Sequence, residues 1–266
     1  AEKKEKGENG VYCHPETRPD YLEAEAVSRL LRIAEAVDIP VVIVHTTNIQ
    51  ALDEVANARW RGQKVFVETC PQYLVLDDSV YYNEDWLQAA KYVCSPPIRT
   101  AEDRDALWRA IRRGEVQTVS TDHCSFTTAQ KLAGRDNFTA IPGGIPGVET
   151  RGELVYTFGV AQRRISLGDM CRVLAENPAK LYGLYPRKGV LAPGSDADIV
   201  IYDPGDSHVI RAEDCVANVD YNPYEGFVTA GGIREVWLRG RKTVENGKVL
   251  DTVPAGMYLA RGKCDL

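Results

Sequence analysis

Three short segments rich in apolar residues constrain this chain more than any other feature of its sequence. They begin at 41, 64 and 116, and each follows a stretch with helical spacing, at 20–37, 49–62 and 100–115 respectively. Val41 to Val44 form a continuous β-branched run, which is typical of a strand buried on both faces of a parallel sheet, and the other two segments are expected to be further strands of this kind. Helix and strand alternate three times, which predicts repeated βα units and an α/β fold.

The pattern changes after Asp122. A loop rich in glycine and proline spans 139–151, and helical stretches follow near 151–163 and 166–184. From Lys188 onward, apolar runs alternate with the turn signals Pro-Gly and Glu-Asn-Gly, which favours short antiparallel strands. The sequence therefore predicts two regions, a βα region over 1–187 and a β-rich small domain with the C-terminal tail over 188–266.

The charge pattern disfavours two classes of partner. The chain has 38 acidic and 32 basic residues, a net charge of −6, and no long basic tract, so a nucleic-acid partner is not expected. No apolar run reaches the roughly 18 residues of a membrane-spanning helix, and the charged first ten residues predict neither a signal peptide nor an anchor. Seven widely spaced cysteines without a CxxC pair favour reduced thiols in the cytoplasm over a disulfide framework.

Polar residues follow the predicted strands at their carboxyl ends. His45 comes after the first run, Glu68, Thr69 and Cys70 after the second, and Asp122 after the third. In a βα barrel the chemistry collects at this end of the strands, so an imidazole and a carboxylate there could face one metal ion. Each residue also has an ordinary explanation, because His45 could be a half-buried histidine and Asp122 could cap a turn.

Other reactive side chains favour structural roles. His123 and Cys124 are adjacent, so on an extended segment they point to opposite sides and form a poor nucleophile and base pair. Cys70 and Cys94 are expected to fill the core as small apolar side chains. His14 and His208 are expected in polar loops without a partner.

Several motifs occur in an order that resembles one enzyme family. They include VVIVHTTN, ETCPQYL, CSPPIR, VSTDHCSF, IPGGIPGVETR, NPAKLYGLYPRKG and GSDADIVIYDP. Together they look like the C-terminal portion of a cyclic amidohydrolase of the dihydropyrimidinase and hydantoinase family, over about 11–255. The resemblance implies the last strands of a TIM-like amidohydrolase barrel followed by a small β-rich domain.

The resemblance also implies a cofactor and a set of site residues. Relatives of this kind hold two zinc ions bridged by a carboxylated lysine and a hydroxide. His45 matches a metal-binding histidine, and Asp122 matches an aspartate that both binds metal and shuttles a proton during catalysis. Ser95 matches a residue that contacts the substrate amide through its backbone, and Gly143 stands where the family usually has a substrate-contacting asparagine. The implied reaction is hydrolysis of a ring amide to an N-carbamoyl amino acid.

Three further elements of the metal site that the resemblance calls for are not found in this sequence. The family also uses a His-x-His pair, the bridging lysine and another histidine, whereas His14 matches only the loop after that histidine. We therefore expect the chain to be part of a longer protein, to lack the complete zinc centre and to be inactive alone. Unpaired strand edges and exposed apolar faces would then favour a homo-oligomer.

Two alternatives stay open at the level of sequence. The PGxET motif is also reminiscent of dihydroorotases, so a dihydroorotase-like or allantoinase-like activity on another small cyclic amide or ureide is possible. The family also includes non-catalytic scaffold relatives that keep the fold without the metal ligands. Retention of both His45 and Asp122 favours an enzyme over a scaffold.

Overall fold

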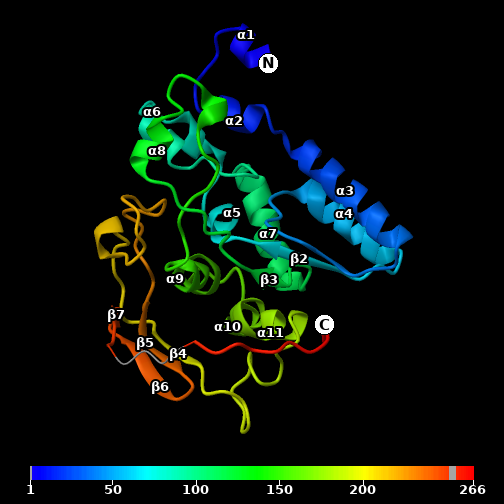
Figure 1. The fold of residues 1–266 in the computed structure, drawn as a ribbon, viewed down its shortest axis with the longest axis vertical. Helices are drawn as coiled ribbons and strands as arrows, with labels where there is room; N and C mark the ends of the chain where they lie inside the picture. Colours follow the sequence, from blue (N-terminus) through cyan, green and yellow to red (C-terminus); the bar gives the residue numbers. More distant parts are fainter. Residues whose placement is uncertain (1, 252–255) are drawn as a thin grey trace. The chain divides into compact units, whose positions relative to one another are not determined.

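The computed structural model describes residues 2–251 and 256–266, and the chain divides into two compact units (Figure 1). The first unit combines Ala1–Arg151 with Ile210–Gly226, and the second combines Gly152–Val209 with Phe227–Leu266. The predicted boundary between residues 187 and 188 lies inside the second unit. The proposed division into a βα region over 1–187 and a β-rich domain over 188–266 stays a prediction.

The first unit is built on a parallel sheet of three strands in the order β1-β2-β3. These strands are β1 (Val41–Ile43), β2 (Val65–Thr69) and β3 (Thr118–Val119). Val42 is opposite Phe66, and Glu68 is opposite Thr118. The three predicted parallel strands are thus confirmed, although each is shorter than its apolar run.

Three long helices accompany these strands in the predicted alternation. They are α3 (Asp20–Ala36), α4 (Ile49–Trp60) and α7 (Ala101–Arg113), and α3 and α4 lie side by side (Figure 1). Each buries one apolar face, with Leu31, Val55 and Leu107 at most 1% exposed. Thr100 caps α7 as predicted, because its Oγ1 accepts from Asp103 N at 3.2 Å.

Short elements fill the rest of the first unit. They are the helices α1 (Glu2–Glu5), α2 (Cys13–Glu16), α5 (Pro71–Val75), α6 (Trp86–Ala90) and α8 (Thr128–Leu132), and the 3-10 turns η1 (Asp78–Tyr82), η2 (Phe138–Ala140) and η5 (Ala212–Asp214). Most of them lie after the carboxyl ends of the strands in sequence. This end of the sheet therefore carries long connections rather than tight turns.

The predicted burial of the strands on both faces holds for β3, where Thr118 and Val119 are both buried, but it is wrong for β2. Along β2 the buried residues Val65, Val67 and Thr69 alternate with the half-exposed Phe66 and Glu68. Alternation of this kind is typical of a sheet covered on one side only. Three strands provide no opposite wall for the second face, so the apolar pattern of the sequence overstates the burial.

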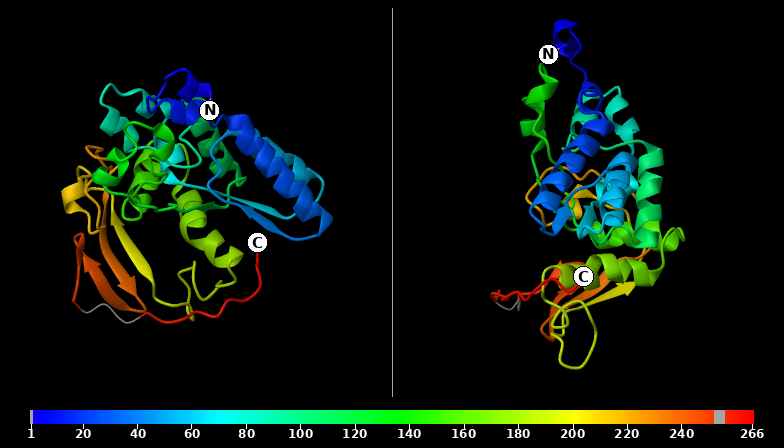
Figure 2. Two further views of the ribbon diagram at one scale, coloured as in Figure 1. Left: turned by 45° about the horizontal axis from the view of Figure 1, so that its top comes forward. Right: turned by 90° about the vertical axis from the view of Figure 1, so that its right-hand side faces the viewer.

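The second unit starts with helix and ends with sheet. Its helical part comprises α9 (Arg151–Val155), α10 (Leu167–Cys171) and α11 (Asn177–Leu181), with the π-helical turns η3 (Tyr156–Ala161) and η4 (Arg172–Glu176). Its antiparallel sheet has the order β4-β5-β6-β7, formed by β4 (Ile199–Asp203), β5 (Gly232–Leu238), β6 (Arg241–Glu245) and β7 (Lys248–Val249) (Figure 2). The predicted helices and short antiparallel strands of this region are confirmed.

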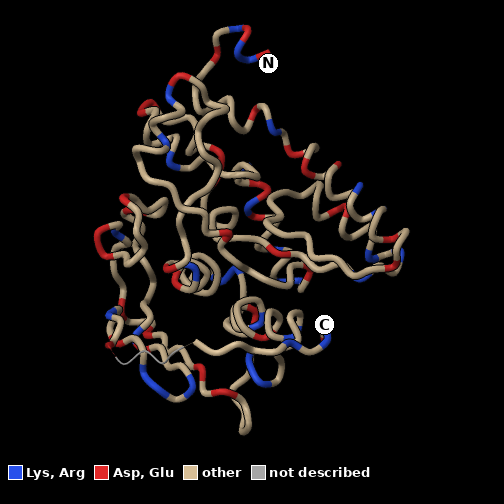
Figure 3. The backbone as a smooth tube through the Cα atoms, viewed as in Figure 1, with Lys and Arg blue, Asp and Glu red and all other residues tan. Residues whose placement is uncertain are grey.

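Three global features accompany this architecture. Acidic and basic residues are interspersed along the backbone, as on α3 and α4 (Figure 3). Among the described helices none combines the length and the apolar character needed to cross a membrane. All seven cysteines are free thiols, and Cys70 and Cys94 are buried as expected of core residues.

Candidate functional site at the carboxyl ends of the parallel strands

His45 and Asp122 follow the two outer strands of the parallel sheet. His45 lies two residues beyond the end of β1, and Asp122 lies three residues beyond the end of β3. The strand between them, β2, ends at Thr69. The neighbouring segments stay in register past the strand ends, since Thr46 N donates to Glu68 O at 2.8 Å and Ser120 N donates to Thr69 O at 3.0 Å. The parallel order thus brings both predicted ligands to one edge of the sheet.

Both predicted ligands have a left-handed backbone. The φ angle is 42° at His45 and 47° at Asp122. For a residue with a Cβ atom this conformation costs roughly 1–2 kcal/mol relative to the right-handed region. Backbone strain of this kind persists only where the surroundings enforce it, and it is concentrated at functional sites. Six non-glycine residues among those described have positive φ, and of these His45 and Asp122 are the two that follow strands of the parallel sheet.

The turn that contains His45 is held by a buried polar network. Glu23 on α3 accepts from the backbone N and the Oγ1 of Thr47, at 2.9 and 2.5 Å. Arg99 donates from Nε to Thr47 Oγ1 at 3.1 Å and from Nη2 to Glu23 Oε2 at 3.1 Å. The Arg99 and Glu23 side chains are only 8% and 11% exposed. In addition, Thr69 Oγ1 donates to Thr46 O at 2.8 Å. Residues remote in sequence therefore set the backbone at His45.

The segment that contains Asp122 is fixed on both sides of the carboxylate. Before it, Thr121 O accepts from Gln72 Nε2 at 3.4 Å. After it, His123 Nδ1 accepts from the backbone N–H groups of Gly147 and Val148, at 3.1 and 3.2 Å. The Nδ1 atom of the imidazole is thus the acceptor of both bonds. His123 thus anchors the glycine- and proline-rich loop, while the Asp122 side chain is exposed.

Ser95 is presented by a loop whose carbonyl groups are bound from inside the unit. His14 Nε2 lies 2.8 Å from Cys94 O, and Tyr73 Oη donates to Pro96 O at 2.9 Å. Ile98 N donates to the buried Tyr81 Oη at 3.0 Å. Because the interior side of this loop is occupied by these bonds, Ser95 itself faces outward and is exposed.

The structure brings Ser95 and Gly143 together, although 48 positions separate them. A Cβ atom added at Gly143 would lie 3.1 Å from Ser95 Oγ and 3.9 Å from Ser95 N. The neighbouring Gly144 is packed against Cys124, since a Cβ atom there would lie 2.5 Å from Cys124 O. Cys124 N also donates to Ile145 O at 3.2 Å. The segments of Asp122, Ser95 and Gly143 are therefore packed against one another. Together with His45, which follows β1 at the same end of the parallel sheet, we call these residues the strand-end site.

The strand-end site provides two ligand types that suit zinc. His45 is half-buried and Asp122 is exposed, and an imidazole nitrogen and a carboxylate oxygen are both common zinc ligands. A catalytic zinc ion usually takes three protein ligands, so these two residues fit part of a metal site. The thiols of Cys70 and Cys94 do not extend the set, because burial raises the pKa of both, that of Cys94 to about 11.

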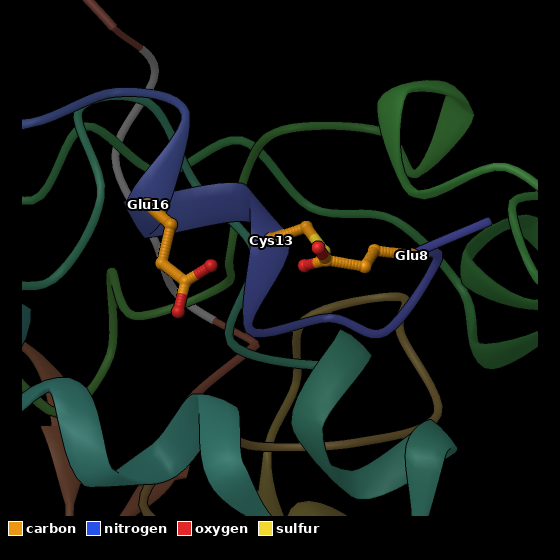
Figure 4. Close-up of side chains that lie close together, drawn as sticks. All are labelled: Glu8, Cys13 and Glu16. Carbon is orange, nitrogen blue, oxygen red and sulfur yellow. The ribbon is translucent and has the colours of Figure 1, made fainter. Parts of the chain in front are cut away.

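A separate cluster of possible ligands lies near the N-terminus. Within the described residues, Glu8, Cys13 and Glu16 form the group of three whose ligand atoms lie within 4.8 Å of one another (Figure 4). Lys3 Nζ already bonds both carboxylates, at 2.5 Å from Glu8 and 2.6 Å from Glu16. These bonds raise the pKa of Lys3, so its ammonium ion offsets part of the negative charge of the two carboxylates, and no metal site is assigned there.

Two buried residues of this region were not found from sequence. The expectation that His14 lies in a polar loop without a partner is wrong, because its ring is 2% exposed and bonds Cys94 O. The apolar neighbours of His14, Val11 and Cys13, were the sequence signal for its burial. Lys131 on α8 is fully buried, although lysine is rarely buried.

His208 in the second unit was also expected to have no partner. Its Nε2 lies 3.5 Å from Glu153, so this expectation is wrong.

Comparison with known proteins identifies relatives along nearly the whole chain. The profile of the Amidohydrolase family matches residues 3–248. A D-hydantoinase of Streptomyces coelicolor is 42% identical over 260 residues, which are 97% of this chain and 55% of that protein. A D-phenylhydantoinase of Escherichia coli is 42% identical over 93% of this chain and 54% of its own length.

Solved structures give the same result at the level of the fold. The crystal structure of a dihydropyrimidinase from Brevibacillus agri superimposes with a TM-score of 0.91 at 40% identity, covering 94% of this chain and 54% of that one. A structure of D-hydantoinase gives a TM-score of 0.91 at 42% identity over 93% of this chain. The chain thus spans a little over half the length of the relatives that it matches.

Proposed function

Because this chain belongs to the amidohydrolase family, we propose that it is the C-terminal part of a zinc-dependent hydrolase that opens hydantoin or dihydropyrimidine rings. The product would be an N-carbamoyl amino acid. The observation that carries the proposal is the pair His45 and Asp122, held in left-handed backbone at the carboxyl ends of two parallel strands. We further propose that 1–187 supply the last strands of a TIM-like barrel and that 188–266 form its small β-rich domain.

Each residue of the strand-end site has a distinct part in this reaction. His45 and Asp122 would hold zinc through a ring nitrogen and a carboxylate oxygen. When bound, zinc lowers the pKa of a water molecule to near 7 and polarises the ring carbonyl. As the water oxygen bonds the carbonyl carbon, an Asp122 oxygen accepts a water proton. It returns this proton to the ring nitrogen when the C–N bond breaks. The backbone at Ser95 and Gly143 orients the ring amide.

Substitutions at the two ligands test this proposal in the complete protein. Asp122→Asn keeps the shape of the side chain but cannot accept the proton, so hydantoin and dihydrouracil turnover should fall by about 100-fold or more. His45→Ala should reduce the bound zinc measured by elemental analysis. A matched control is Asp38→Asn, since Asp38 also has a positive φ, 50°, but lies in the exposed turn after α3. Full activity of the Asp122 variant would contradict the assigned role.

The chain by itself is proposed to be inactive. It provides His45 and Asp122 but not the remaining ligands that a two-zinc centre of this family would need, and it has four histidines in all. The purified chain with added zinc should therefore show no turnover of hydantoin or dihydrouracil. Measurable turnover that depends on Asp122 would overturn this part of the proposal.

The preferred ring of the complete protein can be determined by comparing its activity on several cyclic substrates. A substrate panel of hydantoin, dihydrouracil, dihydroorotate and allantoin separates the main proposal from a dihydroorotase-like or allantoinase-like activity. A non-catalytic scaffold would turn over none of the four. The strained backbone at His45 and Asp122 supports an enzyme, because a scaffold has no use for side chains at this cost.

The assembly and location of the protein are also proposals. Helix α3 exposes Leu22 and Ile33 at 49% and 58%, and Trp60 at the end of α4 is 89% exposed. Exposed apolar side chains in this number favour association, so we propose a homo-oligomer. Light scattering that gives a strict monomer would contradict it. The seven free thiols favour the reducing cytoplasm.

A further inference from the structure

Lys131 carries a fully buried ammonium group bonded to three backbone carbonyl groups. Its Nζ donates to Val93 O at 2.8 Å, to Pro142 O at 2.7 Å and to Gly144 O at 2.8 Å. The side chain has no solvent exposure. A lysine ammonium has three N–H donors, so all three are used and each is directed at the main chain.

The three carbonyl groups belong to the two loops that present Ser95 and Gly143. Val93 lies two residues before Ser95, and Pro142 and Gly144 flank Gly143. The loops are also bonded directly, since Gly144 N donates to the same Val93 O at 3.0 Å. Lys131 is thus the one side chain described in this structure that bonds both loops, and its charge is matched by carbonyl dipoles rather than by a carboxylate.

The position of Lys131 is itself fixed by the fold. Helix α8 begins with a capping box between Thr127 and Gln130. Asp220 Oδ1 accepts from Thr128 N at 2.8 Å, which ties the first turn of α8 to the segment 210–226 of the same unit. The ring of Phe126 lies 5.5 Å from Lys131 Nζ. These contacts hold the ammonium group in place without help from the two loops.

We propose that Lys131 is a positioning residue that clamps the Ser95 loop to the Gly143 loop and so sets the wall of the strand-end site against which a cyclic amide ring binds. The reference to a ring rests on the proposed function, whereas the clamp is a property of this chain alone. Lys131 does not touch the reacting atoms. It acts through the backbone at Ser95 and Gly143, where a shift of one loop relative to the other would misalign the ring amide.

Hydrogen exchange measured by mass spectrometry on this chain tests the clamp without any activity. Lys131→Met keeps the length and the apolar stem but removes the three bonds. We expect amide exchange in both segments, 92–96 and 141–146, to become about tenfold faster or more, while α3 is unchanged. Lys64→Met is the matched control, because Lys64 is an exposed lysine of the same unit. Unchanged exchange in either loop segment would overturn the clamp.

A pH series on the unsubstituted chain gives a second readout that does not depend on the variant folding. Burial lowers the pKa of Lys131 to about 8, and the titratable groups that face it are Cys94, Cys124 and His14. A neutral amine has two N–H donors for three carbonyl groups. After correction for intrinsic rates, both loop segments should therefore lose protection between pH 7 and 9.5 while α3 does not. The same pH series on Cys124→Ser shows whether titration of this exposed thiol causes the loss of protection. Equal protection of the loop segments at both pH values would contradict the clamp.

The same measurement separates the clamp from the proposed function. Hydantoin added to the complete protein should slow exchange in both loop segments if the wall binds a ring. If the loops exchange faster in Lys131→Met but hydantoin does not protect them, the clamp is supported and binding of a ring at this wall is contradicted. If hydantoin protects the loops equally in Lys131→Met and in the unsubstituted protein, binding of a ring is supported and the positioning role of Lys131 is contradicted.

Discussion

The strand-end site of the first unit and the hairpins of the second unit both contain residues with positive φ, but they reach this conformation by different means. In the second unit the turns are Arg239-Gly240 and Asn246-Gly247, with φ of 49° and 76° and of 48° and 74°. Positive φ at two successive residues is what a two-residue type I′ hairpin requires, and the glycine at the second position of each turn meets it without strain. At His45 and Asp122 no glycine is present, and distant residues enforce the conformation.

The difference shows that two kinds of information specify this chain. The hairpins are encoded by the residues that form them, so they depend little on the rest of the molecule. The strand-end site is encoded by Glu23, Arg99 and Lys131, which lie elsewhere in the sequence and bond its backbone. Substitutions of the distant residues should therefore have large effects, and substitutions of the hairpin glycines small ones.

The largest effect is expected from the buried ion pair beside His45. Arg99→Met leaves the Glu23 carboxylate buried without its cation, which should lower the free energy of unfolding by about 3–5 kcal/mol. Urea denaturation of this chain at pH 7 measures the change. The double variant Glu23→Gln with Arg99→Met should lose less than the sum of the single variants, because the unpaired charge is gone. Strictly additive losses would mean that the two side chains are not coupled.

A pH-dependent loss of stability is expected from His14. Burial lowers the pKa of His14 from 6.5 to about 4, so between these values the unfolded chain binds more protons than the folded one. The contribution of His14 to stability is therefore complete above about pH 6.5 and declines as the pH falls to 4, by about 3 kcal/mol. Urea denaturation at pH 7 and at pH 4.5 should show a smaller pH effect in His14→Gln. An equal pH effect in both proteins would contradict the assignment.

A medium effect separates the two neighbouring glycines of the loop. Gly144→Ala places a Cβ atom 2.5 Å from Cys124 O, a backbone atom that cannot move alone, so a loss of about 1–3 kcal/mol is expected. Gly143→Ala meets only Ser95 Oγ at 3.1 Å, and this hydroxyl can rotate away. Thermal unfolding should therefore distinguish the pair. If the two variants lose the same stability, the close packing of Gly144 on Cys124 is not a constraint.

The smallest effect compares the two regions directly. Gly247→Ala meets no atom within 4 Å, so it costs only the left-handed conformation, about 1 kcal/mol. Asp122→Gly removes the strain of the left-handed backbone, but glycine loses more conformational entropy on folding than aspartate does. The free energy of unfolding should therefore stay within about 1 kcal/mol of the parent or rise slightly. Denaturation curves of both variants measure the direction of each change in the free energy of unfolding. A large loss in Asp122→Gly would show that the carboxylate supports the fold rather than the chemistry.

The sequence was sufficient for those parts of the fold that follow from local patterns. The apolar runs predicted the three parallel strands, the Glu-Asn-Gly turn predicted a hairpin between β6 and β7, and Thr100 predicted the start of α7. The burial of the strands was overestimated, because an apolar run does not reveal how many neighbours the sheet has. Residue types and their place after the strands also predicted His45 and Asp122 as site candidates.

The supporting contacts could not be predicted, because they join residues distant in sequence. The residues next to Lys131 in sequence do not indicate that it is buried, because its burial depends on carbonyl groups that lie 11 to 38 positions away. His14 was misassigned for a related reason, because its partner Cys94 lies 80 positions along the chain. The strained φ angles of His45 and Asp122 are also invisible in sequence, where each residue type is compatible with an ordinary turn.

The left-handed backbone at His45 and Asp122 also has an evolutionary consequence. A descendant that abandoned catalysis would gain stability by accepting glycine or asparagine at either position, so drift would remove both side chains within few substitutions. If catalysis were lost, the backbone conformation alone would not retain an imidazole or a carboxylate at either position.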